Sequence, residues 1–341
     1  MKYFLVALTL VVVLGCLFAW NGIYRPVSDS AETITFLIKK GESVKEISSN
    51  LEKQGLIRQD FLFRAYALIK GKHRVLNAGE YSLSKSMNIP GILEKFVKGE
   101  VVKKEITIIE GWNLRDIGWY FENEGMFMAE ELFELVGFPA TDYPNMAELR
   151  DFSQEFSFLE DKPKNVSLEG YLFPDTYEIS PGVSLEEIIK ELMVNFGKKL
   201  TLDLRNEIAS QGKSVFEIIT MASLIEKEVK TLEDKKIVSG ILWKRLENKI
   251  PLQADAAIVY ITGKKSTKVS TSETKIDSPY NTYKYRGLPL GPISNPGEES
   301  ILAAVYPQDS PYFYYLSTPE GETIFSQTLE EHNIAKAQYL K

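Results

Sequence analysis

The sequence has few of the residues that form disulfides and metal sites. Among 341 residues there is one cysteine, Cys16, and there are two histidines, His73 and His332. A single cysteine excludes an intrachain disulfide and a cysteine-based metal cage, and two histidines argue against a His-rich metal site. No block of the sequence is strongly basic, because 40 Lys and Arg residues face 47 Asp and Glu residues, for a net charge of −7. We therefore expect no metal, no cofactor and no nucleic-acid partner.

The overall composition is that of a folded chain. Apolar residues make up 44% and charged residues 26% of the sequence, which is near the average for globular proteins and excludes wholesale disorder. A chain of 341 residues is long enough for two or three domains, each with a core of its own. Stability therefore does not require disulfides.

One long apolar run stands at the N-terminus. Residues Phe4 to Trp20 contain no charge, and as a helix these 17 residues would measure about 25 Å, near the lower limit for crossing a bilayer. A cleaved signal peptide would end in small residues, whereas this run ends in Phe18, Ala19 and Trp20. Cys16 after Val13-Leu14-Gly15 would suit a lipoprotein signal, but the apolar run continues beyond it. The pattern favours an uncleaved anchor.

An anchor of this kind predicts the topology of the whole chain. Lys2 would lie inside, Trp20 and Tyr24 would lie at the membrane interface, and everything after Arg25 would lie outside the cytoplasm. We expect residues 1–26 to form a single-pass anchor in the cell membrane, with the remainder on its periplasmic or outer face.

The chain after the anchor contains an internal repeat. Residues 41–56 align with residues 111–126 at a constant offset of 70 positions, and each copy follows an alternating apolar stretch. Each continues with apolar residues three and four apart, has Ser43 or Asn113 in the position of a helix N-cap, and ends at a glycine. This pattern predicts a strand followed by a capped helix in both copies, and it could be no more than a recurring structural unit.

The first copy also resembles the beginning of LysM peptidoglycan-binding modules. Tyr81 and a second helix at 89–97 would complete a small α/β unit over residues 33–103. Residues 104–341 would then form the remaining domain, which begins at 104–160 with the second copy and a connecting arm. The irregular stretch of this arm, rich in Pro, Asn, Asp and Ser, covers 137–168. Helices are predicted from Ser184 to Gly197, from near Ser214 to Val229 and over 235–246, and the chain becomes turn-rich after Pro251.

Three segments concentrate carboxylate, aromatic and amide side chains in a way that a purely structural role does not require. The segment 168–177 packs two carboxylates and three aromatic residues around Gly and Pro, and 222–229 places two glutamates on an otherwise apolar helix. The third is the Tyr- and Asn-rich stretch 278–283 with the Gly- and Pro-rich stretch 287–297 that follows. Flat rings suit the faces of sugars and amides suit their hydroxyl groups, so these segments predict a sugar site.

Helical geometry separates the two glutamates. At about 100° per residue, Glu226 and Glu228 lie roughly 80° to either side of the apolar stripe centred on Ile225, about 160° apart. On a straight helix they cannot form one two-carboxylate site. Periodicity alone does not choose between them, and both could be solvated surface charges.

The segments together resemble the YceG-like family of endolytic murein transglycosylases. The resemblance rests on the anchor and on five stretches in order: 169–177 (EGYLFPDTY), 221–228 (MASLIEKE), 252–260 (LQADAAIVY), 278–297 (SPYNTYKYRGLPLGPISNPG) and 332–333 (HN). It implies cleavage of nascent peptidoglycan strands between N-acetylmuramic acid and N-acetylglucosamine, leaving 1,6-anhydro-muramic ends and setting strand length. Peptidoglycan is then the partner, with cell-wall synthesis proteins as further candidates.

A second resemblance bears on the catalytic residue. In the lysozyme-like lytic transglycosylases the catalytic helix reads Glu-Ser after apolar positions, and that register places Glu228 as the acid. Val229 stands where a hydroxyl residue is expected, so Glu226 stays the alternative. The candidates for binding the sugar and stabilising charge are Glu169, Asp175, Gln253, Asp255, Tyr280, Asn281 and Tyr283. His332 is expected to pack or cap the last helix.

These inferences define one fold and three candidate functions. We expect an α+β protein with an N-terminal membrane helix, a small LysM-like subdomain and a mixed catalytic domain with a lysozyme-like helical element. A lytic transglycosylase needs one protonated carboxyl group near the scissile bond, which fits the separated glutamates. A glycan-binding scaffold without turnover and a hydrolytic muramidase remain the alternatives.

Overall fold

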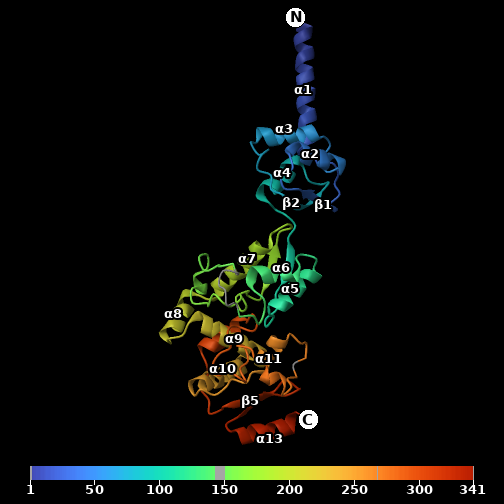
Figure 1. The fold of residues 1–341 in the computed structure, drawn as a ribbon. Helices are drawn as coiled ribbons and strands as arrows, with labels where there is room; N and C mark the ends of the chain where they lie inside the picture. The colour runs from blue at the N-terminus through green and yellow to red at the C-terminus, as the bar shows by residue number, and fades with distance from the viewer. Residues whose placement is uncertain (1, 143–149, 267, 341) are drawn as a thin grey trace. The chain divides into compact units, whose positions relative to one another are not determined.

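The structure, a computed structural model, describes residues 2–142, 150–266 and 268–340. In these residues helices predominate and three short two-stranded sheets accompany them, which confirms the predicted α+β class (Figure 1). The chain forms two compact units, Met1–Ile106 with Tyr177–Val183 and Thr107–Thr176 with Ser184–Lys341. The domain boundaries predicted from the sequence stay a prediction.

The first unit contains the long N-terminal helix and a small α/β body. Its elements are α1 (Lys2–Tyr24), β1 (Thr33–Ile38), α2 (Val44–Lys53), α3 (Asp60–Ile69), β2 (Gly79–Ser84) and α4 (Ile89–Lys98). Two further strands, β3 (Lys104–Thr107) and β4 (Thr176–Ile179), pair with each other at the point where the chain passes between the units. Of the described helices, α1 alone is long and apolar enough to cross a membrane, a property that signal sequences share.

Most of α1 is exposed, and its last turns rest on the body of the first unit. Gly22 is the buried residue of this helix and lies against Leu62 of α3. The rings of Trp20 and Tyr24 lie 4.5 Å apart, and Tyr24 meets Tyr66 edge to face. An apolar helix exposed over its remaining length requires an apolar surrounding, which a bilayer supplies.

The core of the first unit forms between one face of the β1–β2 sheet and the helices. The strands are antiparallel, with Phe36 opposite Tyr81. Both rings pack on Phe96 of α4, at centroid distances of 5.7 and 4.7 Å. The two strands and the helices α2, α3 and α4 thus build one small core, and the LysM-like character of this unit stays a prediction.

The internal repeat appears as two copies of the same local structure. Ser43 caps α2 and Asn113 caps α5 (Leu114–Asn123), each in a reciprocal capping box with the acidic residue three positions later. Both helices are followed by a glycine in the left-handed region, with φ of 67° at Gly55 and 65° at Gly125. Only glycine adopts that conformation without strain, so the sequence signal has a direct local cause.

The second unit is mainly helical. Besides α5 it contains α6 (Ala129–Val136), η1 (Ser157–Leu159), α7 (Leu185–Lys199), α8 (Leu202–Ser210), α9 (Val215–Glu228), α10 (Leu232–Glu247), α11 (Asp255–Thr262), η2 (Glu273–Lys275), α12 (Glu298–Val305), β5 (Tyr314–Ser317), β6 (Thr323–Ser326) and α13 (Leu329–Tyr339). The strands β5 and β6 form an antiparallel hairpin. Part of the predicted connecting arm, residues 143–149, lies outside the described residues, and its described part contains η1 alone as regular structure.

The centre of the second unit is α9. Residues 218–225 of this helix are all buried, because α8, α10, α11 and α12 pack around it. A helix covered on all sides needs partners for its polar groups. Ser223 provides them: its hydroxyl accepts from the amide of Ile293, and its carbonyl accepts from the hydroxyl of Ser294. These bonds hold the Gly- and Pro-rich loop against the helix that carries both glutamates.

Candidate active site

A cleft of about 1280 Å³ opens at the C-terminal end of α9. It lies within the second unit, and its walls come from α5, α9, α10, α11, the β5–β6 hairpin and α13. Glu228 is the last residue of α9 and lines this cleft. The helix ends there because Val229 is extended, with φ −143° and ψ 160°.

The Glu228 carboxyl group is partly buried. The residue as a whole is partly exposed, but its Oε1 atom is buried and has no hydrogen-bond partner among the described residues. Burial, followed by the negative charge of Asp255, raises the pKa of Glu228 from 4.5 to about 7, against a hydrogen bond with Tyr315 that lowers it. Near neutral pH the group can therefore hold a proton and release it.

Asp255 and Tyr283 stand beside this carboxyl group in the cleft wall. Asp255 begins α11 and accepts a hydrogen bond of 2.5 Å from the Tyr283 hydroxyl group. Just before it, Gln253 has φ 54°, a conformation that non-glycine residues rarely adopt. Its Oε1 accepts from the Arg245 guanidinium at 2.9 Å, which helps to fix this strained turn at the site.

Glu226 takes a structural position on the other side of α9. Its carboxylate accepts from the Gly297 amide at 3.0 Å and the Ser300 hydroxyl at 2.6 Å, at the start of α12. It also lies 3.5 Å from the ammonium group of Lys235, and its side chain is 9% exposed. Glu226 is not among the residues lining the cleft. The two glutamates thus serve different surroundings, as their positions on the helix require.

Two further sequence candidates, Glu169 and Asp175, do not line the cleft. Glu169 is 1% exposed, accepts from the Leu114 amide and the Asn295 side-chain amide, both at 3.1 Å, and has its pKa raised to about 8 by burial. Asp175 is exposed and accepts from the Asn195 side-chain amide at 2.9 Å. Glu169 links the start of α5 to the loop before α12.

Tyr280 and Asn281 lie inside the loop whose Tyr283 side chain lines the cleft. Both are 1% exposed, and neither lines the cleft. The Asn281 side-chain amide donates to the carbonyls of Thr274 and Ile276, and its oxygen accepts from the backbone amides at 283 and 284. The structure therefore brings Gln253, Asp255 and Tyr283 to Glu228 and places the other four candidates elsewhere.

The cleft contains residues that the sequence did not single out. Arg245 of α10 and Tyr315 of β5 both line it, and Tyr315 makes a hydrogen bond with Glu228. His332 is 8% exposed, stacks on Tyr314 at a centroid distance of 5.3 Å as expected for a packing residue, and also lines the cleft. Burial and the charges of Lys336 and Arg245 lower the pKa of His332, which favours its neutral form. In the sequence, the run of aromatic residues at 312–315 is the one feature that could have indicated this wall of the cleft.

The family of the chain follows from comparison with known proteins. The model of the YceG-like family matches residues 36–338, which is most of the sequence. The chain belongs to the YceG-like family. The sequence resemblance is therefore confirmed. Within the described residues no three His, Cys, Asp or Glu side chains converge as metal ligands would.

Several known proteins are similar to nearly the whole chain. An endolytic murein transglycosylase of Bacillus subtilis (strain 168) is 34% identical over 96% of this chain and 90% of its own length. One of Streptococcus pneumoniae (strain ATCC BAA-255 / R6) is 32% identical over 92% of this chain, which spans 59% of that longer protein. The crystal structure of a putative YceG-like protein of Listeria monocytogenes matches with a TM-score of 0.60 at 34% identity, covering 90% of this chain and all of that one.

Proposed function

We propose that this protein is a membrane-anchored endolytic lytic transglycosylase with Glu228 as its catalytic acid. The activity is that named for its relatives in B. subtilis and S. pneumoniae. The observation that carries the assignment to Glu228 is its position: a carboxyl group with a pKa of about 7 and an unpartnered oxygen in a cleft large enough for several sugar rings.

The proposed reaction uses one carboxyl group twice. Protonated Glu228 donates to the glycosidic oxygen between N-acetylmuramic acid and N-acetylglucosamine, and the bond from this oxygen to the muramic C1 breaks. The carboxylate then takes the proton of the muramic C6 hydroxyl group, whose oxygen closes on C1 to give the 1,6-anhydro ring. No water enters, so the carboxylate pair of an ordinary glycosidase is not required.

The surroundings of Glu228 fit both steps. The nearby negative charge of Asp255 favours the protonated form of Glu228 before cleavage. The same charge would stabilise the positive charge that develops on C1 as it gains oxocarbenium character. The hydrogen bond of Tyr315 stabilises the carboxylate that forms after donation. Gln253 and Tyr283, which line the same cleft, would contact the sugar hydroxyl groups.

The proposal extends to the place of the reaction. With α1 in the cell membrane and the second unit outside it, the cleft would act on strands that are still being made, set their length and work beside the synthesis proteins. A glycan-binding scaffold and a hydrolytic muramidase are the competing functions.

One digestion separates the three functions. Purified glycan strands are incubated with the full chain, and the masses of the new ends are measured. We expect products with anhydro ends and no added water. A mass gain of one water per cut would show a hydrolase, and unchanged strands would show a scaffold; either result overturns the proposal.

A further inference from the structure

The charge of the cleft is opposite to that of the whole chain. The chain has a net charge of −7, yet seven of the residues lining the cleft are Lys or Arg and three are Asp or Glu. One of those three acids is Glu228, whose raised pKa leaves it partly protonated near neutral pH. A cleft lined with one sign of charge attracts ligands of the other sign. Its lining therefore indicates an anionic ligand.

Three of the seven cations are fixed in the wall without losing their charge. Arg115, Lys227 and Arg245 donate to backbone carbonyl oxygens at 2.7, 3.0 and 2.6 Å. Carbonyl oxygens orient these side chains but carry no formal charge that would cancel theirs. The cations come from α5, α9 and α10, so the positive potential extends over several walls of the cleft.

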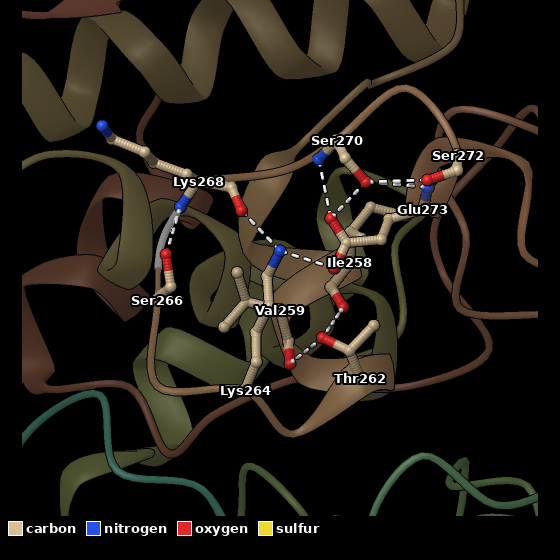
Figure 2. A network of polar contacts seen from close by, with 9 residues as sticks. All are labelled: Ile258, Val259, Thr262, Lys264, Ser266, Lys268, Ser270, Ser272 and Glu273. Atoms are coloured by element: carbon tan, nitrogen blue, oxygen red, sulfur yellow. Dashed lines mark hydrogen bonds and ion pairs between the residues drawn. The ribbon is translucent and has the colours of Figure 1, made fainter.

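Three more cations are exposed at the cleft and have no ion pair with any described residue. Lys265 and Lys268 lie in the loop after α11, and Lys336 lies on α13. Lys264 gives that loop its shape, because its ammonium group bonds the Lys268 carbonyl and the Glu273 carboxylate, the latter at 2.6 Å (Figure 2). The ammonium group of Lys268 points away from this network (Figure 2). These lysines are free to meet a ligand.

The proposed substrate supplies anions in one place. The sugar rings of peptidoglycan are uncharged, whereas the peptide on the lactyl group of each N-acetylmuramic acid carries free carboxylates. We propose that Lys265, Lys268 and Lys336 bind the carboxylates of this stem peptide, an inference that rests on the proposed function. The enzyme then selects strands that still bear their peptides over strands that have lost them.

The test compares three substrates of the same sugar sequence with the full chain. One bears intact stem peptides, one bears peptides whose carboxylates have been converted to amides, and one has been stripped of peptides. At low salt we expect kcat/KM for the intact strands to exceed that for the amidated strands about tenfold. Each exposed ion pair contributes modestly, and the three lysines together give a factor of about this size. In about 1 M salt, where the Debye length is about 3 Å, the preference should disappear.

A triple variant assigns the preference to the lysines. In the Lys265→Gln, Lys268→Gln, Lys336→Gln protein the ratio of intact to amidated strands should approach one, with the change mainly in KM. Lys198→Gln is the matched control, because Lys198 is also exposed, lies on α7 and does not line the cleft. It should keep the wild-type ratio.

Three results would overturn the assignment. The first is a wild-type enzyme that cuts all three substrates equally. The second is a triple variant that keeps the wild-type ratio while its urea midpoint is unchanged. The third is competition by soluble polyglycerol phosphate as effective as that by free stem peptide, which would show a general anion site. A wild-type protein that cuts none of the substrates refutes the proposed function instead.

Discussion

Replacing Glu228 by glutamine should stabilise the second unit, and only above mildly acidic pH. The folded chain holds the Glu228 proton more tightly than the unfolded chain, because burial raises the pKa of this group from 4.5 to about 7. Between these two values the folded state binds more protons, so the free energy of unfolding falls as pH rises and stays low above about pH 7. Glutamine carries no charge and removes this effect.

The size of the gain follows from the shift. A rise from 4.5 to about 7 corresponds to about 3 kcal/mol at about pH 8. Solvent at the open side of the cleft screens part of it, so we expect Glu228→Gln to gain about 1–3 kcal/mol there. Near pH 4, where the carboxyl group is protonated in both states, the gain should vanish.

Tryptophan fluorescence in urea measures this difference, because Trp112, Trp119 and Trp243, three of the four tryptophans, lie in the second unit. Glu226→Gln is the matched control on the same helix. It weakens two hydrogen bonds to the start of α12 and the contact with the buried Lys235 ammonium group, so it should lose about 1–3 kcal/mol. A loss of stability in Glu228→Gln at about pH 8, or an equal gain near pH 4, would refute the reasoning.

Three further outcomes are expected. The rate on glycan strands should fall as pH rises through about 7, where Glu228 loses its proton, and a rate that climbs steadily to about pH 9 would exclude Glu228 as the acid. Asn281→Ala should lower the free energy of unfolding by about 2–4 kcal/mol, because four backbone groups lose their partner; an unchanged urea midpoint would contradict this. Protease added to intact spheroplasts should digest residues 28–341, and a protected full-length chain would show the opposite topology.

The features that the sequence predicted well are those with local causes. The caps at Ser43 and Asn113 and the glycines that follow the two helices depend on a few neighbouring residues, and all appear in the structure. The separation of Glu226 from Glu228 depends only on the pitch of a helix, and the structure places them in different surroundings.

The remaining features depend on contacts between distant segments. Nothing near Asn281 in the sequence shows that its side chain bonds the backbone of its own loop rather than a ligand. Arg245 and Tyr315 line the same cleft as Glu228 only because α10 packs on α9 and β5 meets its end, where the Ser317 hydroxyl group donates to the Glu228 carbonyl. The elements after Pro251 were expected as turns, but α11, α12 and the β5–β6 hairpin form there because they bury their apolar faces on the rest of the unit.

The turnover of Glu228→Gln on purified glycan strands tests the account most directly. The variant keeps the size of the side chain but cannot donate or accept the proton, so the rate of formation of anhydro ends should fall by about 10²–10⁴. Glu226→Gln, assayed at a temperature where it remains folded, should keep most of the wild-type rate. Full activity in Glu228→Gln together with loss in a folded Glu226→Gln would contradict the assignment, and full activity in both would remove this helix from the chemistry.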